Sequence, residues 1–153
     1  MALFTIQVEE KAKLTQVTLS GVVDETADFA PLAELTGAVE IHCGDVRRLN
    51  SMGVRLWSDA MRALTQHADV AFVACSRAVV HQISMIGGFL GKGRVASFHA
   101  PMRCEVCDYE ADHFIDADAY VASGRMPPLA CPNGHGPMVL DEIEDIYLQF
   151  LST

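Results

Sequence analysis

The first part of the chain alternates apolar and polar side chains in the period of β-strands. Residues 4–9 and 14–19 each show this alternation, which is typical of strands with one buried face, and the polar stretch 10–13 joins them as a hairpin. A third strand is predicted at residues 39–43. Between them, a short amphipathic helix is predicted from Phe29, Leu32, Leu35 and Pro31, ending at Gly37.

The clearest helical pattern follows residue 50. Val54, Trp57, Met61 and Leu64 are spaced so that they form one apolar stripe along about three turns of helix. Ser51 stands just before this stripe and is predicted to cap the helix with its hydroxyl.

The pattern of alternating elements continues to residue 98. Residues 70–75 form an apolar run of strand length, residues 78–86 carry a helical stripe that stops at Gly87, and residues 95–98 predict a fifth strand. Helical crossovers between strands require parallel neighbours, so the fold class is predicted to be α/β, a mixed sheet packed with helices. One more helix is expected at 141–151.

The last third of the chain carries residues with the spacing of a metal site. Cys104 and Cys107 form a CxxC pair, and Cys131 and His135 follow after a gap of 23 residues. Two short loops that each offer two such ligands match the needs of tetrahedral Zn²⁺. We therefore predict a structural zinc site, because three thiolates and one imidazole would leave no open position for catalysis.

The fourth ligand position has two candidates. His113 competes for it, although the glycines on both sides of His135 favour His135. Between the two ligand pairs, residues 116–125 are polar and are predicted to form a loop that projects from the metal.

Charge and composition separate the two parts of the chain. Residues 1–100 have a net charge of −1, whereas residues 101–153 have a net charge of −8, so we predict an α/β domain over 1–100 and a zinc-ribbon-like module over 101–153. The acidic module argues against nucleic-acid binding. No apolar run is long enough for a membrane span, and the chain start lacks a signal-peptide pattern. Cys43 and Cys75 lie in apolar strands, where free cysteines pack as small apolar residues, so no disulfide framework is expected. A cytoplasmic location is therefore expected.

The segment from Asp45 to Val54, together with the order of elements, resembles the STAS family of sulfate transporters and anti-sigma factor antagonists. In that family a strand ends in Asp and leads to an Asp-Ser-Ser-Gly-Leu-like turn at a helix start. Asp45, Ser51, Gly53 and Val54 match this pattern. Asn50 replaces the second Asp, and Met52 stands where regulated antagonists carry their phosphorylated Ser or Thr. The likeness covers residues 4–100 and implies a STAS-like fold.

The resemblance implies a regulatory protein rather than an enzyme. The expected partner is an anti-sigma factor or serine-kinase-like ATPase, a signalling complex or a transporter component, docked at Asn50, Ser51, Met52 and Gly53. Met52 cannot accept a phosphate, and Ser51 is expected to act as a cap, so the docking surface lacks the family's usual switch. A zinc- or redox-responsive sensor is the alternative, and the formation of a homodimer stays open.

Overall fold

The computed structural model describes residues 3–151. The strands and helices, in chain order, are β1 (Thr5–Glu10), β2 (Thr15–Val23), η1 (Ala30–Leu32), β3 (Gly37–Leu49), α1 (Ser51–Leu64), β4 (Ala68–Val73), α2 (Arg77–Met85), β5 (Arg94–Val95), β6 (Ser97–Arg103), β7 (Glu110–Asp116), α3 (Ala117–Ser123), β8 (Val139–Leu140), α4 (Glu144–Tyr147) and η2 (Gln149–Leu151).

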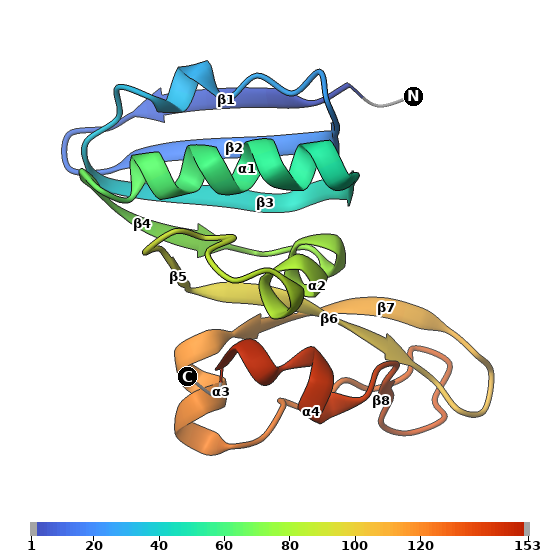
Figure 1. The fold of residues 1–153 in the computed structure, drawn as a ribbon. Coiled ribbons are helices and arrows are strands. Elements are labelled where there is room, and N and C mark those ends of the chain that lie inside the picture. The colour runs from blue at the N-terminus through green and yellow to red at the C-terminus, as the bar shows by residue number, and fades with distance from the viewer. Residues whose placement is uncertain (1–2, 152–153) are drawn as a thin grey trace.

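The predicted α/β class is confirmed by a mixed sheet of five strands in the order β1-β2-β3-β4-β5 (Figure 1). β1 and β2 form the expected antiparallel hairpin, and β2, β3, β4 and β5 run parallel to their neighbours. Each parallel pair has a crossover connection: β2 and β3 through the segment with η1, β3 and β4 through α1, and β4 and β5 through α2.

The core of this sheet lies under α1. Of the predicted stripe, Trp57, Met61 and Leu64 are buried, and Val54 is half-buried. The Trp57 ring stacks on Phe89 with a centroid separation of 5.0 Å and an interplanar angle of 4°. The apolar face of α1 therefore packs both against the sheet and against the loop that follows α2.

The third strand is longer than the sequence pattern predicts. β3 covers thirteen residues rather than the predicted 39–43, and it contains a bulge opposite Leu19 of β2. The bulge breaks the simple alternation of apolar and polar residues, so the strand continues where the pattern ends.

Two predicted helices are shorter than expected. The helix expected before residue 37 is a single 3-10 turn, η1, and the helix expected at 141–151 is one turn of α-helix followed by the 3-10 turn η2. The predicted projecting loop at 116–125 is wrong for most of its length, because residues 117–123 form α3. Asp116 caps that helix by accepting from the Ala119 amide at 2.9 Å, and Gly124 ends it with a φ of 70°.

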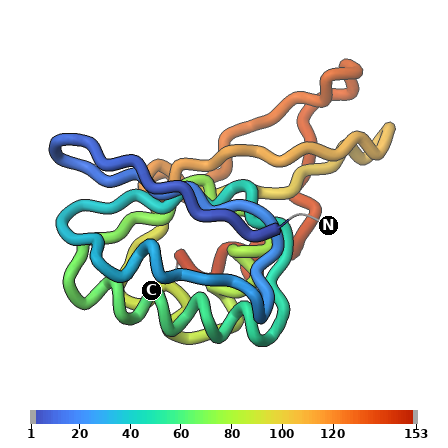
Figure 2. The backbone as a smooth tube through the Cα atoms, turned by 90° about the horizontal axis from the view of Figure 1, so that it is seen from above, coloured from blue at the N-terminus to red at the C-terminus, as the bar shows by residue number. Residues whose placement is uncertain are grey.

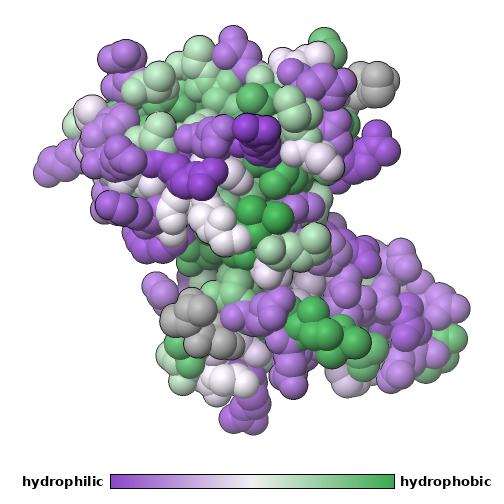
Figure 3. All heavy atoms as spheres, viewed as in Figure 1, coloured by the Kyte–Doolittle hydropathy of each residue, from purple (hydrophilic) through white to green (hydrophobic). Residues whose placement is uncertain are grey.

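A second sheet, in the order β7-β6-β8, carries the rest of the chain. β6 pairs along its whole length with β7 and at its end with β8. It is also linked to the first sheet, because Phe98 forms a parallel bridge with Cys75, just after β4. The predicted domain boundary at residue 100 falls inside this strand. Figure 2 shows β6 and β7 extending as an arm from the side of the five-stranded sheet opposite α1. The surface narrows where the two parts meet, and apolar side chains are visible at this waist (Figure 3).

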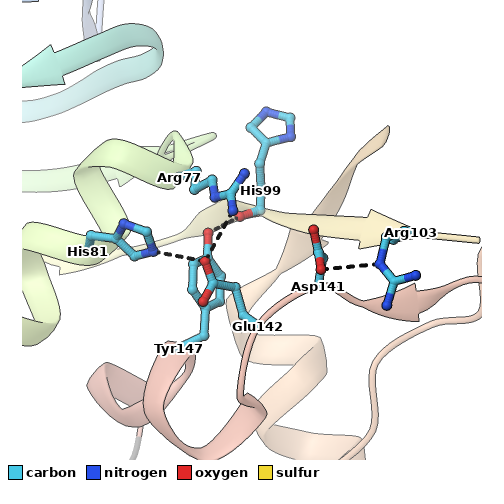
Figure 4. A network of polar contacts seen from close by, with 7 residues as sticks. All are labelled: Arg77, His81, His99, Arg103, Asp141, Glu142 and Tyr147. Carbon is cyan, nitrogen blue, oxygen red and sulfur yellow. Dashed lines mark hydrogen bonds and ion pairs between the residues drawn. The ribbon is translucent and has the colours of Figure 1, made fainter. Parts of the chain in front are cut away.

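Polar contacts fix the C-terminal segment against α2 and β6 (Figure 4). Glu142 accepts a hydrogen bond from Arg77 at 3.3 Å and lies 3.2 Å from His81 Nε2. The buried Tyr147 hydroxyl donates to the His99 carbonyl at 2.6 Å. Burial raises the pKa of Tyr147, so its hydroxyl stays protonated and remains a donor.

Candidate metal centre

The first pair of predicted metal ligands, Cys104 and Cys107, lies in the turn between β6 and β7. The Cys104 amide donates to the Tyr109 carbonyl and the Asp108 amide donates to the Cys104 carbonyl, both at 2.9 Å. These bonds close a tight turn, in which the Val106 amide points at Cys104 Sγ from 3.4 Å. The turn therefore holds the Cys104 and Cys107 sulfurs on one side of the hairpin tip.

The second pair lies in a similar turn closed by a bridge between Ala130 and Pro137. The Cys131 amide donates to the Gly136 carbonyl at 2.9 Å, and the Asn133 amide points at Cys131 Sγ from 3.4 Å. Gly134 has a φ of 79°, a left-handed conformation that glycine adopts without strain. The two turns lie side by side at the end of the arm (Figure 2).

The four predicted ligands converge at the tip of the arm. Their ligand atoms all lie within 4.8 Å of one another. Cys107 and Cys131 are separated by 3.6 Å between sulfurs, and His135 Nδ1 lies 3.7 Å from Cys131 Sγ and 3.8 Å from Cys104 Sγ. A tetrahedral ion with Zn–S of about 2.3 Å and Zn–N of about 2.0 Å places its ligands roughly 3.5–3.8 Å apart. This cluster can therefore hold a metal ion.

His113, the competing fourth ligand, lies elsewhere. Its Nε2 is 3.0 Å from the Pro127 carbonyl oxygen, and it does not belong to the cluster. The structure thus brings His135 to the three thiols, as the glycines beside it favoured.

Hydrogen bonds in the two turns favour thiolates. The side-chain amide of Asn133 donates to Cys107 Sγ at 3.5 Å and is the main reason why the pKa of Cys107 is lowered to about 6. The backbone amide of Cys107 lowers the pKa of Cys104, while burial raises the pKa of Cys131. Contact with the Cys107 thiolate raises the pKa of His135. Thiolates are the form that binds metal, so the turns prepare at least two ligands.

The residues predicted for partner docking lie at the start of α1, and the cap prediction there is wrong. Asn50, not Ser51, is the N-cap, because its side-chain oxygen accepts from the Gly53 amide at 2.8 Å. Ser51 is the first helical residue and is exposed, as is Met52, which has 49% of its surface accessible. Asn is as good a cap as Ser, so no local signal in the sequence separated these two adjacent candidates.

Gly53 is fixed by its closeness to β2. A Cβ atom at this position would lie 2.0 Å from the Val23 carbonyl oxygen, so only glycine fits. The Asn50 amide also donates to Val23, at 3.1 Å. The start of α1 is therefore held tightly against the end of the sheet.

No family model and no curated protein matches this chain. Across residues 3–151, no helix is both long enough and apolar enough to cross a membrane.

Proposed function

We propose that this chain is a non-enzymatic regulatory or scaffold protein that docks a cytoplasmic protein partner through Asn50, Ser51, Met52 and Gly53. The observation that carries the proposal is the half-exposed Met52 on a rigidly held helix start. A flexible, polarizable side chain next to free backbone N–H groups suits recognition of another protein.

The rigidity of this surface supports docking. The Asn50 side chain accepts from the first turn of α1 and donates to Glu25 at 2.9 Å, so it links the helix to the loop after β2. A surface that is already ordered loses little conformational entropy when a partner binds. By resemblance to the STAS family, the partner class is an anti-sigma factor or serine-kinase-like ATPase, with a signalling complex or a transporter component as other settings.

The Cys₃His cluster would serve this protein as a structural zinc site. Cys104, Cys107, Cys131 and His135 would fill all four positions of a tetrahedral ion. Such an ion would tie the β6–β7 turn to the segment before β8 and hold the arm rigid.

Two matched substitutions test the docking surface. Met52→Glu places a charge in the proposed interface, whereas Met85→Glu makes the same change on α2, where Met85 is 70% exposed. The tagged proteins are purified from the native host, and co-purifying proteins are quantified by mass spectrometry. We expect the Met52 variant alone to lose the partner. Equal recovery with both variants would remove this surface from the interface.

A zinc- or redox-responsive sensor is the second candidate, and one observation favours it. Cys107 is the exposed thiol of the cluster, and its pKa of about 6 gives it thiolate character at neutral pH. Zinc release is measured with a chromophoric chelator during mild peroxide treatment. Release at peroxide doses that leave the fold intact supports the sensor, whereas retention of zinc until unfolding supports a structural site.

A further inference from the structure

The face of the five-stranded sheet opposite α1 is polar. The residues of β2 and β3 that alternate with the buried core residues lie on this face and are half-buried. The strand register aligns them into two rows across the sheet, Gln7–Thr18–His42 and Glu9–Gln16–Glu40. Three strands therefore contribute hydrogen-bonding side chains to one surface.

The bulge in β3 adds a carboxylate to this surface. Thr18 pairs with His42 and Ser20 pairs with Asp45, so Leu19 faces two residues of β3 instead of one. Without the bulge, Asp45 would point to the same side as the buried Cys43. The extra residue turns Asp45 to the side of His42 and leaves the next residue, Val46, buried.

A second histidine closes the surface into a cleft. The ring of His99 projects from β6 away from the polar network of the C-terminal segment (Figure 4). Its Nε2 would lie 3.6 Å from a Cβ on Gly44, so the glycine leaves room for the ring. Ala74, at the end of β4, also lines the cleft and has a φ of 54°, a strained conformation for alanine. The cleft has a volume of about 730 Å³.

Two imidazole nitrogens in this region lack partners. Within the described part of the chain, His42 Nε2 and His99 Nδ1 are shielded from solvent and make no hydrogen bond. His42 Nε2 lies 3.5 Å from Glu40 Oε1 without hydrogen-bond geometry. Shielded polar atoms of this kind are usually paired, so the two histidine rings beside the cleft have unused hydrogen-bonding capacity.

The charge of the cleft selects the kind of ligand. Glu9 and Asp45 line it, and among residues 3–151 no Lys or Arg does. The Cys₃His cluster is the only group of three or more His, Cys, Asp or Glu in the same range that is close enough for a metal ion, so the cleft is not a preformed metal site. Carboxylates and unprotonated imidazole nitrogens are acceptors, which a guanidinium or ammonium group satisfies by donating several hydrogen bonds.

We infer that this cleft, between His42, Asp45, His99 and Glu9, binds an organic cation that bears a guanidinium or amino group. The inference is independent of the proposed docking surface, because none of these residues belongs to it. The cation has two sources, a free small molecule or an arginine side chain of a partner peptide, and both offer the same chemistry.

The test uses this whole chain with ¹⁵N-labelled histidine. Agmatine and a blocked tripeptide with a central arginine are titrated separately, and the ring resonances of His42 and His99 are followed by NMR. We expect saturable shifts of both rings with at least one probe. Asp45→Asn should weaken binding about tenfold, since it removes one charge-assisted contact. Glu34→Gln removes one charge outside the cleft and should leave the affinity within about twofold.

Each outcome decides the inference. Binding of agmatine indicates a small-molecule site, and binding of the peptide alone indicates recognition of a partner's arginine. If neither probe moves the two rings, or if Asp45→Asn binds as tightly as the parent protein, the inference is wrong. Binding of butylurea, which is neutral and has no amino group, as tightly as agmatine would also overturn it, because the proposed recognition depends on positive charge.

Discussion

Removal of the metal from the Cys₃His cluster should lower the stability of the whole chain. The two ligand-bearing turns are joined by the hydrogen bonds and sulfur contacts described above, and a bound ion would cross-link them covalently through its ligand bonds. Chelation, or the variant Cys131→Ser, removes this cross-link. The tip of the arm would then be held by the pairing of β6 with β7 and β8 and by the hydrogen bonds within each turn.

The magnitude follows from the length of the loop that the ion closes. The joined thiols are 24 positions apart in the chain. The chain-entropy relation for a cross-link over a loop of this length gives about 3.5 kcal/mol of stabilisation. Domains of this size lose roughly 2–4 °C of melting temperature per kcal/mol, so we expect a decrease of about 7–14 °C.

The assay combines elemental analysis with calorimetric melting. The protein as purified should contain about one equivalent of zinc. Cys131→Ser should contain much less, melt earlier than the parent protein and show no further change with chelator. His113→Gln is the matched histidine control, since His113 lies outside the cluster, and it should keep its zinc. A protein that contains no metal, or whose melting temperature is unchanged by chelator, would refute the reasoning.

Three further predictions concern single positions. Asn50→Ala should cost about 1 kcal/mol in chemical denaturation because the helix cap is lost, whereas Ser51→Ala should change stability by less than about 0.5 kcal/mol; the reverse order would restore Ser51 as the cap. Gly53→Ala should destabilise by about 3 kcal/mol, because its methyl group would meet a carbonyl of β2, while Gly87→Ala has open space and should be near neutral by the same measurement. In metal-free protein, Cys107 is a thiolate above its pKa of about 6. The hydrogen bonds that stabilise this thiolate are therefore lost as the pH falls through 6. The rate of Cys107 alkylation should be half-maximal near the same pH. A midpoint near the ordinary thiol value of about 8.5 would show that the turn opens without metal.

Local patterns in the sequence were enough for the main elements of the sheet. The strand alternation of the first hairpin and the apolar stripe of α1 depend on side-chain periods of two and 3.6 residues, which do not require knowledge of distant neighbours. The residues of the Cys₃His cluster were also predictable from the sequence, because cysteine and histidine at this spacing serve few other purposes. For the fourth position of the cluster, only the conformational freedom of the glycines beside His135 favoured it over His113.

Other features depend on contacts between distant segments. The cap of α1 lies at Asn50 because the helix starts where Gly53 contacts Val23. Asn50 and Ser51 are adjacent and both residue types are good caps, so the sequence alone does not predict which of them caps the helix. The cleft depends on the bulge in β3 and on His99 of β6, which is more than fifty positions away from His42 in the chain.

The sequence by itself therefore determined the α/β class, the amphipathic face of α1 and the four residues of the Cys₃His cluster, because side-chain type and local period decide these. Only the tertiary structure decided how far β3 extends, that a bridge from β6 links the two sheets and that the expected helix at 141–151 has only one α-helical turn. These outcomes depend on strand register and on packing against residues remote in the chain. Local propensity is too weak to override such contacts.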